Sequence, residues 1–140
     1  KVMADITARK ASTDRQDGVV LPFKMGVEEI LEGALVAINA AGYAVNAGDD
    51  ASTVVVGVAD ETVDNSGGSN GDKEITVVRT GVFTFNTAYS AAQTDVNNIA
   101  MASDNQTVDL AANTTNDIPV GRIVEVLSSS KVRVDIRDRA

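Results

Sequence analysis

The sequence contains no cysteine, no histidine and no tryptophan. The absence of cysteine excludes disulfide bonds, thiolate metal sites and a cysteine nucleophile. The absence of histidine removes the side chain that most often serves as a general base near neutral pH and as a ligand of transition metals. Catalysis would have to use carboxylates, lysine or tyrosine, so we expect a protein that is not an enzyme.

Aromatic residues are also scarce, at 4% of the chain, although 44% of the residues are hydrophobic. The core must therefore be built from valine, isoleucine, leucine and alanine, and β-branched residues fit best on pleated sheets. A length of 140 residues is typical of one domain. These features predict a small, single-domain, mainly β protein of the sandwich or barrel type.

Long apolar runs are missing as well. No run approaches the roughly 20 residues of a membrane span, and residues 1–10 lack the apolar centre of a signal peptide. We therefore expect a soluble protein with no membrane partner.

Negative charge dominates the chain, with a net charge of -8, but it is unevenly distributed. Five basic and three acidic residues give residues 1–24 a charge of +2, and the same numbers give +2 for residues 122–140. Residues 25–121 hold two basic residues against fourteen acidic ones, a charge of -12. An acidic body repels phosphate, so we expect no nucleic-acid partner. Acidity that only maintains solubility is the simpler alternative.

Residues 1–17 mix charged residues with alanine, serine and threonine and show no sustained period. This pattern predicts an extended N-terminal arm that becomes ordered only against a partner, followed by a β domain over residues 18–140.

Short apolar segments separated by turn residues predict the strands of that domain. The clearest case is the alternation of Val132, Val134 and Ile136 with polar residues, which predicts a strand paired in a hairpin with residues 122–127. Residues 27–38 fit either a helix or a buried strand, and Gly33 favours a short turn into a strand. The other predicted elements are strands at 18–21, 54–59, 74–85 and 120–127, loop with short strand pieces at 97–117, and one short helix at 88–93 capped by Thr87. After the first of these strands, Pro22 indicates either an edge position or the end of the strand.

Two sets of acidic residues deserve a test as chemical sites. The adjacent pairs are Glu28-Glu29, Asp49-Asp50 and Asp60-Glu61, but neighbours on a strand point to opposite faces and cannot share a proton. The second set, whose oxygens could bind Ca²⁺, comprises Asp60, Asp64, Asn65 and Asp72, but its order does not match a calcium loop.

Two further patterns resemble binding motifs. Gly67, Gly68 and Gly71 precede Lys73 without the spacing of a phosphate loop, so residues 65–72 are predicted to connect a hairpin. Phe83 and Phe85 share one face of a strand, where core packing is favoured over a stacking platform for nucleic acid. No metal, cofactor or catalytic residue is therefore predicted.

The order of the segments resembles that of the small head-decoration, or capsid-cement, proteins of tailed bacteriophages. Four segments carry the resemblance, which spans residues 18–137: Glu32-Gly33-Ala34-Leu35-Val36-Ala37-Ile38, Val56-Gly57-Val58-Ala59, Ile75-Thr76-Val77-Val78-Arg79-Thr80-Gly81-Val82-Phe83 and Val120-Gly121-Arg122-Ile123-Val124-Glu125. One departure is that Thr94-Asp95 stands where such proteins often have Gly-Asp, so the resemblance does not set the register of residues 94–117.

The resemblance implies a β domain that assembles as a homotrimer on the outer surface of the phage head. There it would bind the major capsid protein at three-fold and quasi-three-fold junctions and stabilise the shell, with the N-terminal arm reaching onto the capsid. The basic residues that would contact the capsid are Lys1, Arg9, Lys10 and Arg15. The alternative is a surface or adhesion β module outside the capsid, of the fibre, pilus or surface-layer type, which the richness in threonine, asparagine and aspartate also fits.

Overall fold

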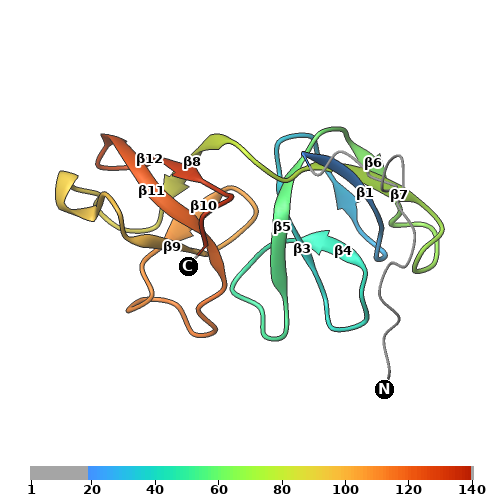
Figure 1. Cartoon of the computed structure of the whole chain (residues 1–140). Coiled ribbons are helices and arrows are strands. Elements are labelled where there is room, and N and C mark those ends of the chain that lie inside the picture. The colour runs from blue at the N-terminus through green and yellow to red at the C-terminus, as the bar shows by residue number, and fades with distance from the viewer. Residues whose placement is uncertain (1–18, 140) are drawn as a thin grey trace, which may run out of the picture.

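A computed structural model describes residues 19–139, which form twelve strands and one short 3-10 helix (Figure 1). The prediction of a mainly β fold with a barrel-like sheet and one short helix is confirmed. The predicted arm over residues 1–17, with Lys1, Arg9, Lys10 and Arg15, lies outside the described residues.

The first half of the described chain forms a five-stranded sheet with the strand order β1-β7-β5-β3-β4. Its members are β1 (Val20–Lys24), β3 (Leu35–Ile38), β4 (Ala44–Asn46), β5 (Val54–Ala59) and β7 (Glu74–Val78), and all their pairings are antiparallel. A two-stranded ribbon, β2 (Glu29–Ile30) with β6 (Val63–Asp64), accompanies this sheet. The prediction that a turn leads into a strand within residues 27–38 is thereby confirmed.

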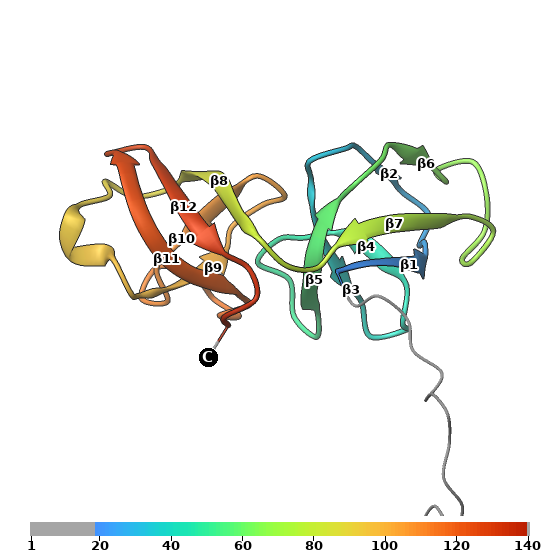
Figure 2. The same ribbon diagram turned by 45° about the horizontal axis from the view of Figure 1, so that its top comes forward.

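The second half forms a closed five-stranded barrel in the order β10-β8-β12-β11-β9, which lies beside the first sheet (Figure 2). Its strands are β8 (Val82–Thr87), β9 (Ile99–Ala102), β10 (Thr107–Asp109), β11 (Pro119–Ser128) and β12 (Lys131–Asp135). β11 and β12 form the predicted hairpin. The short pieces β9 and β10 confirm the prediction for residues 97–117.

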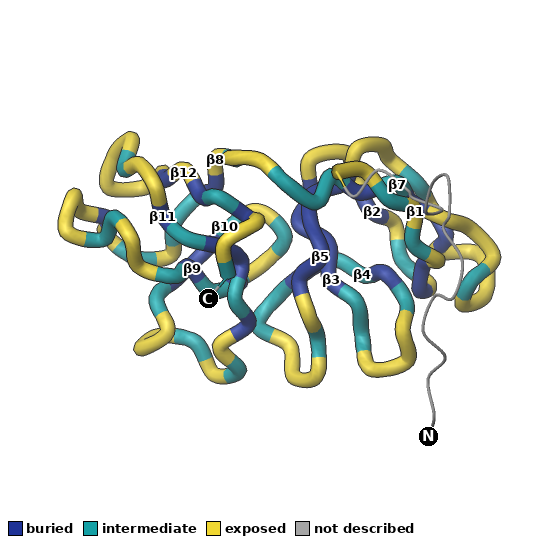
Figure 3. The backbone as a smooth tube through the Cα atoms, viewed as in Figure 1, coloured by how far each residue is buried: buried dark blue, intermediate teal, exposed yellow. Residues whose placement is uncertain are grey.

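β3 and β5 are buried on both faces, which explains why they are continuous apolar runs rather than alternating ones (Figure 3). One face of these strands, with Val36 and Val56, packs inside the first half of the molecule. The other face, with Leu35 and Val55, joins a cluster that also contains barrel residues such as Ile123. A single apolar cluster therefore connects the sheet to the barrel.

The prediction of one strand over residues 74–85 is wrong, because this segment contains two strands in different sheets. β7 belongs to the five-stranded sheet and β8 to the barrel. Between them, Gly81 has a φ of 132°, a backbone conformation that residues other than glycine rarely adopt. Its carbonyl accepts a hydrogen bond from Ile136 N at 3.1 Å. The apolar character continues through the segment, but the chain changes direction at the glycine.

The helix predicted over residues 88–93 is also wrong in position, since the only helical turn of the described chain is η1 (Gln93–Asp95). The backbone of the predicted helix bonds to β10 and to the β11–β12 turn instead: Ala88 N donates to Val108 O and Ala91 N to Ser129 O. Thr87 does not cap a helix, because its hydroxyl donates to the carbonyl oxygens of Tyr89 and Ser129. These long-range hydrogen bonds override the helical preference of the alanines, because tertiary contacts routinely outweigh intrinsic propensity.

The hairpin predicted across residues 65–72 is not formed either. The strand before this loop, β6, pairs with β2, and the strand after it, β7, pairs with β1 and β5. The loop is anchored by Asn65, which is buried and whose Nδ2 donates to Gly26 O and Ser69 O at 2.9 and 3.0 Å. The glycine-rich segment is therefore a loop that connects two sheets, and the amide side chain of Asn65 anchors it.

Candidate functional site

The adjacent acidic pairs do not form carboxylate dyads. Glu28 Oε1 accepts hydrogen bonds from the backbone and side-chain amides of Asn46, both at 2.9 Å, whereas Glu29 is exposed on β2. Glu61 Oε2 accepts from Thr76 N at 3.0 Å. The carboxylates of Glu28 and Glu61 therefore bind amide groups of segments 15 or more positions away, which fixes the segments relative to each other.

Asp49 joins two loops that are far apart in the sequence. Its Oδ2 accepts from Thr115 N and its Oδ1 from Asn116 N, both at 2.8 Å. These two backbone donors, together with the Asn116 side chain, hold the pKa of Asp49 below its ordinary value of 3.8. The carboxylate thus ties the loop before β5 to the loop before β11.

Of the four residues considered as calcium ligands, Asp64, Asn65 and Asp72 line one pocket together with Lys73, whereas Asp60 lies elsewhere. Asp64 Oδ1 accepts from the backbone and hydroxyl of Ser66, and Asp72 Oδ2 accepts from Ser69 N. These contacts with Ser66 lower the pKa of Asp64 below 3.8, and Asp60 instead lines a different cavity. Within residues 19–139, no group of three or more acidic side chains is placed to hold a metal ion.

Phe83 and Phe85 lie on the inner face of β8, with Phe85 buried in the core cluster and Phe83 half-buried against it. The sequence prediction that these rings pack in the core rather than form a stacking platform agrees with this placement.

The two edges of the five-stranded sheet differ in how far they are covered. At the β4 edge, Ala44 O accepts from Gly26 N at 2.9 Å, and Asn46 N donates to Glu28 Oε1. Edge strands that keep their backbone groups unpaired are templates for pairing with another chain, and covering them prevents such pairing. The β4 edge is protected in this way.

Within residues 19–139, the β1 edge is the open one. Val19 O accepts a hydrogen bond from Arg79 N, and Met25 N donates to Lys73 O. The backbone N–H and C=O groups of the odd-numbered residues of β1 therefore point towards β7. The backbone groups of Val20, Pro22 and Lys24 therefore point away from the sheet. Among residues 19–139, these outward-pointing backbone groups form no hydrogen bond. Pro22 sits at a position where the missing N–H costs no ladder bond, as expected for an edge strand.

The position of Pro22 corrects one boundary. We predicted a strand over residues 18–21 with Pro22 either at an edge position or at the end of the strand. The edge position is correct, but β1 runs from Val20 to Lys24 with Pro22 at its centre, opposite Thr76. Proline has no N–H to donate and is therefore excluded from central strands. It is tolerated where the backbone of an edge strand points to solvent, so β1 continues through Pro22. We take the β1 edge as the candidate functional site, because it combines an open ladder with the point at which residues 1–18 join the described body.

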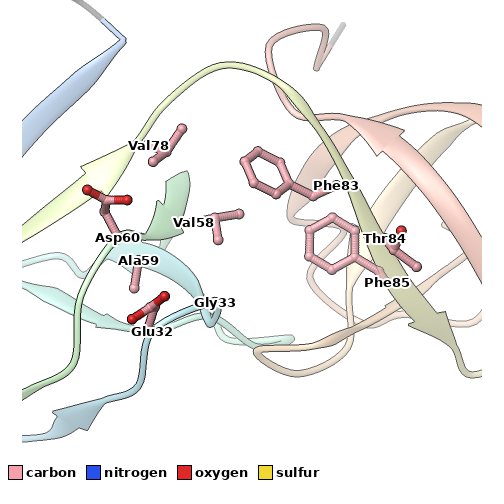
Figure 4. A pocket seen from close by; sticks show the side chains of 9 residues that line it. All are labelled: Glu32, Gly33, Val58, Ala59, Asp60, Val78, Phe83, Thr84 and Phe85. Carbon is pink, nitrogen blue, oxygen red and sulfur yellow. The ribbon is translucent and has the colours of Figure 1, made fainter.

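A second feature, which the sequence did not reveal, is a cleft between the first sheet and the barrel, with a volume of about 260 Å³ (Figure 4). It is lined by Glu32, Gly33, Val58, Ala59, Asp60, Val78, Phe83, Thr84 and Phe85. These residues come from segments up to 53 positions apart, so no local pattern could have grouped them.

The sequence matches no protein-family model and no curated protein. In the described part of the chain, no helix is long and apolar enough to cross a membrane.

Proposed function

We propose that this protein is a head-decoration protein of a tailed bacteriophage, which binds the major capsid protein on the outer surface of the shell and stabilises it. The observation that carries the proposal is the edge of β1, which no other part of residues 19–139 covers. This strand directly follows the segment predicted as an arm, and its Val20, Pro22 and Lys24 backbone groups face outward. The order of strand segments seen in decoration proteins also supports it.

The mechanism is strand addition. An extended arm or a partner strand that meets the β1 edge continues the sheet, and main-chain hydrogen bonds supply affinity without reactive side chains. The basic arm residues Lys1, Arg9, Lys10 and Arg15 add attraction to acidic surface on the shell. No catalytic step is part of this function.

The assembled form is a homotrimer at three-fold and quasi-three-fold junctions. Three arms on one trimer engage neighbouring capsid subunits together, so that modest single contacts combine through their effective concentration. The trimer resists the outward pressure of packaged DNA without touching it, which is consistent with an acidic body.

The test is a deletion variant that begins at Gly18, compared with the full chain for cosedimentation with undecorated heads. We expect the deletion variant to fold, because β1 and all later strands are kept, and to lose head binding. As a matched control, replacement of Lys1, Arg9, Lys10 and Arg15 by glutamine keeps the arm length and should weaken binding less. Binding by the deletion variant that equals that of the full chain refutes the arm mechanism. A monomer that ignores heads in every form favours the adhesion alternative.

A further inference from the structure

The cleft between the five-stranded sheet and the barrel has two chemically different sides (Figure 4). Buried Val58 and Phe85 and half-buried Phe83 supply apolar surface. Glu32 and Asp60 add two exposed carboxylates from the first half of the chain. The cleft therefore offers an apolar surface next to negative charge.

Within residues 19–139, neither of these two carboxylates forms an ion pair. The ion pairs formed within residues 19–139 are Arg122 with Asp138 and Arg133 with Glu125, both in the barrel half. In this part of the molecule the carboxylates of Glu32 and Asp60 accept no hydrogen bond. Only the backbone amides of these residues donate, to Thr62 Oγ1 and Thr76 O.

The nearest cation along the chain does not fill the cleft. Arg79 follows the cleft residue Val78, but its Nε donates to Val56 O at 3.2 Å. Its guanidinium lies 5.7 Å from the centre of the Phe23 ring. Arg79 is thus engaged at the sheet, and no cation among residues 19–139 pairs with the carboxylates of the cleft.

A lysine or arginine side chain fits these two surfaces. Its aliphatic stem covers apolar surface while its cationic end reaches carboxylates. The face of an aromatic ring such as Phe83 also attracts a cation. A volume of about 260 Å³ accommodates one long side chain rather than a folded segment.

We propose that this cleft receives a lysine or arginine side chain of the capsid shell protein, as a second contact beside the β1 edge. The inference rests on the proposed function, because it assigns the cation to the shell. It predicts that part of the attachment is electrostatic and weakens as salt is added.

The test compares head binding by the full-length protein, by Glu32→Gln/Asp60→Asn, and by the control Glu29→Gln/Asp50→Asn. Both double variants remove two exposed carboxylates from the first half of the molecule and have the same net charge. We expect the cleft variant to need a roughly five- to tenfold higher concentration for half-decoration. It should also lose much of the salt dependence, whereas the control should bind like the unmodified protein.

The outcomes separate the two proposals. If the unmodified protein does not bind heads, the proposed function fails. If it binds and the cleft variant binds equally well, or if both double variants weaken equally, the cleft assignment is overturned. Light scattering should give the same oligomeric state for all three proteins; dissociation of the cleft variant alone would assign the cation to another copy of this chain and also overturn the assignment. A Glu32→Lys variant, with its charge reversed at the exposed position, should bind more weakly still.

Discussion

Asp49 and Asn116, 67 positions apart, hold each other through two hydrogen bonds of 2.8 Å: Asn116 N donates to Asp49 Oδ1, and Asn116 Nδ2 donates to Asp49 O. The pair joins a loop of the five-stranded sheet to a loop of the barrel. It is one of several polar contacts between the halves, together with Asn105 Nδ2 to Asn46 Oδ1 and Leu35 N to Asn105 O. The halves are thus connected by polar loops as well as by the shared apolar cluster.

The first prediction concerns Asp49. Replacement by alanine leaves two backbone donors without their acceptor, so we expect a lower melting temperature than for the control Asp50→Ala, whose side chain accepts no hydrogen bond from the described residues. Because the folded-state pKa of Asp49 lies below 3.8, its contribution to stability is present above the unfolded pKa and is lost as the pH falls through the folded pKa.

Thermal melts at pH values above and below 3.8 check the prediction. The difference between the unmodified protein and Asp49→Ala should shrink well below pH 3.8. A difference that stays constant down to the lowest pH would contradict a role for the ionised carboxylate.

The second prediction concerns Leu35, which is fully buried where the sheet meets the barrel. Leu35→Ala should lower the free energy of unfolding by about 2–5 kcal/mol. The control Leu31→Ala, at a side chain that is 55% exposed, should change it by no more than about 0.5 kcal/mol. Because the cluster spans both halves, denaturant unfolding should remain a single transition. Two separate transitions in the unmodified protein would contradict the shared core.

The third prediction concerns Gly57, at the close contact of β5 with β7. Its φ is 154°, and a Cβ added there would lie 2.2 Å from Val78 O, which is too close for any side chain. Gly57→Ala should cost about 3 kcal/mol or more. Gly67→Ala, where nothing lies within 4 Å, is the control and should be close to neutral. Equal stabilities of the two variants in denaturant titrations would show that the contact relaxes freely.

The fourth prediction concerns Tyr89. Burial, with the charges of Asp95 and Asp109, raises its pKa to about 12 from 10.0. The folded state therefore holds the proton over a range in which the unfolded state has lost it, so stability should fall as the pH rises from 10 towards 12. The tyrosinate absorbance that disappears in Tyr89→Phe should titrate near 12. If this absorbance titrates at the ordinary tyrosine pKa of 10.0, the raised pKa of Tyr89 is refuted.

The same variant tests a packing argument. Within residues 19–139 the Tyr89 hydroxyl is buried without a hydrogen-bond partner, and a buried unpaired polar group is destabilising. Tyr89→Phe should therefore melt no lower than the unmodified protein.

The sequence predicted best where the pattern is local. The alternation at Val132 and Val134 reports one buried face, and β12 follows it. It predicted least where a distant partner decides the outcome. Ala88 and Ala91 have helical character, but Val108 O and Ser129 O take their N–H groups. Residues 74–85 have the pattern of one apolar strand, and between β7 and β8 only Gly81 has a positive φ.

The candidate site follows the same rule. Pro22 marked an edge strand from the sequence, and β1 is an edge. That β1 is the open edge and β4 the covered one depends on Gly26 and Glu28, which contact Ala44 and Asn46 across the fold. The cleft had no sequence signal at all, because Glu32 and Phe83 become neighbours only when the two halves pack.

The central claim is that this protein works by binding the outside of a phage head. The most direct measurement is cryo-electron microscopy of undecorated heads of the matching phage, imaged with and without the full-length protein. The account predicts added density with three-fold symmetry on the outer surface, at the three-fold and quasi-three-fold junctions, with a strand continuing the sheet beside β1. Heads that look the same with and without the protein would contradict it.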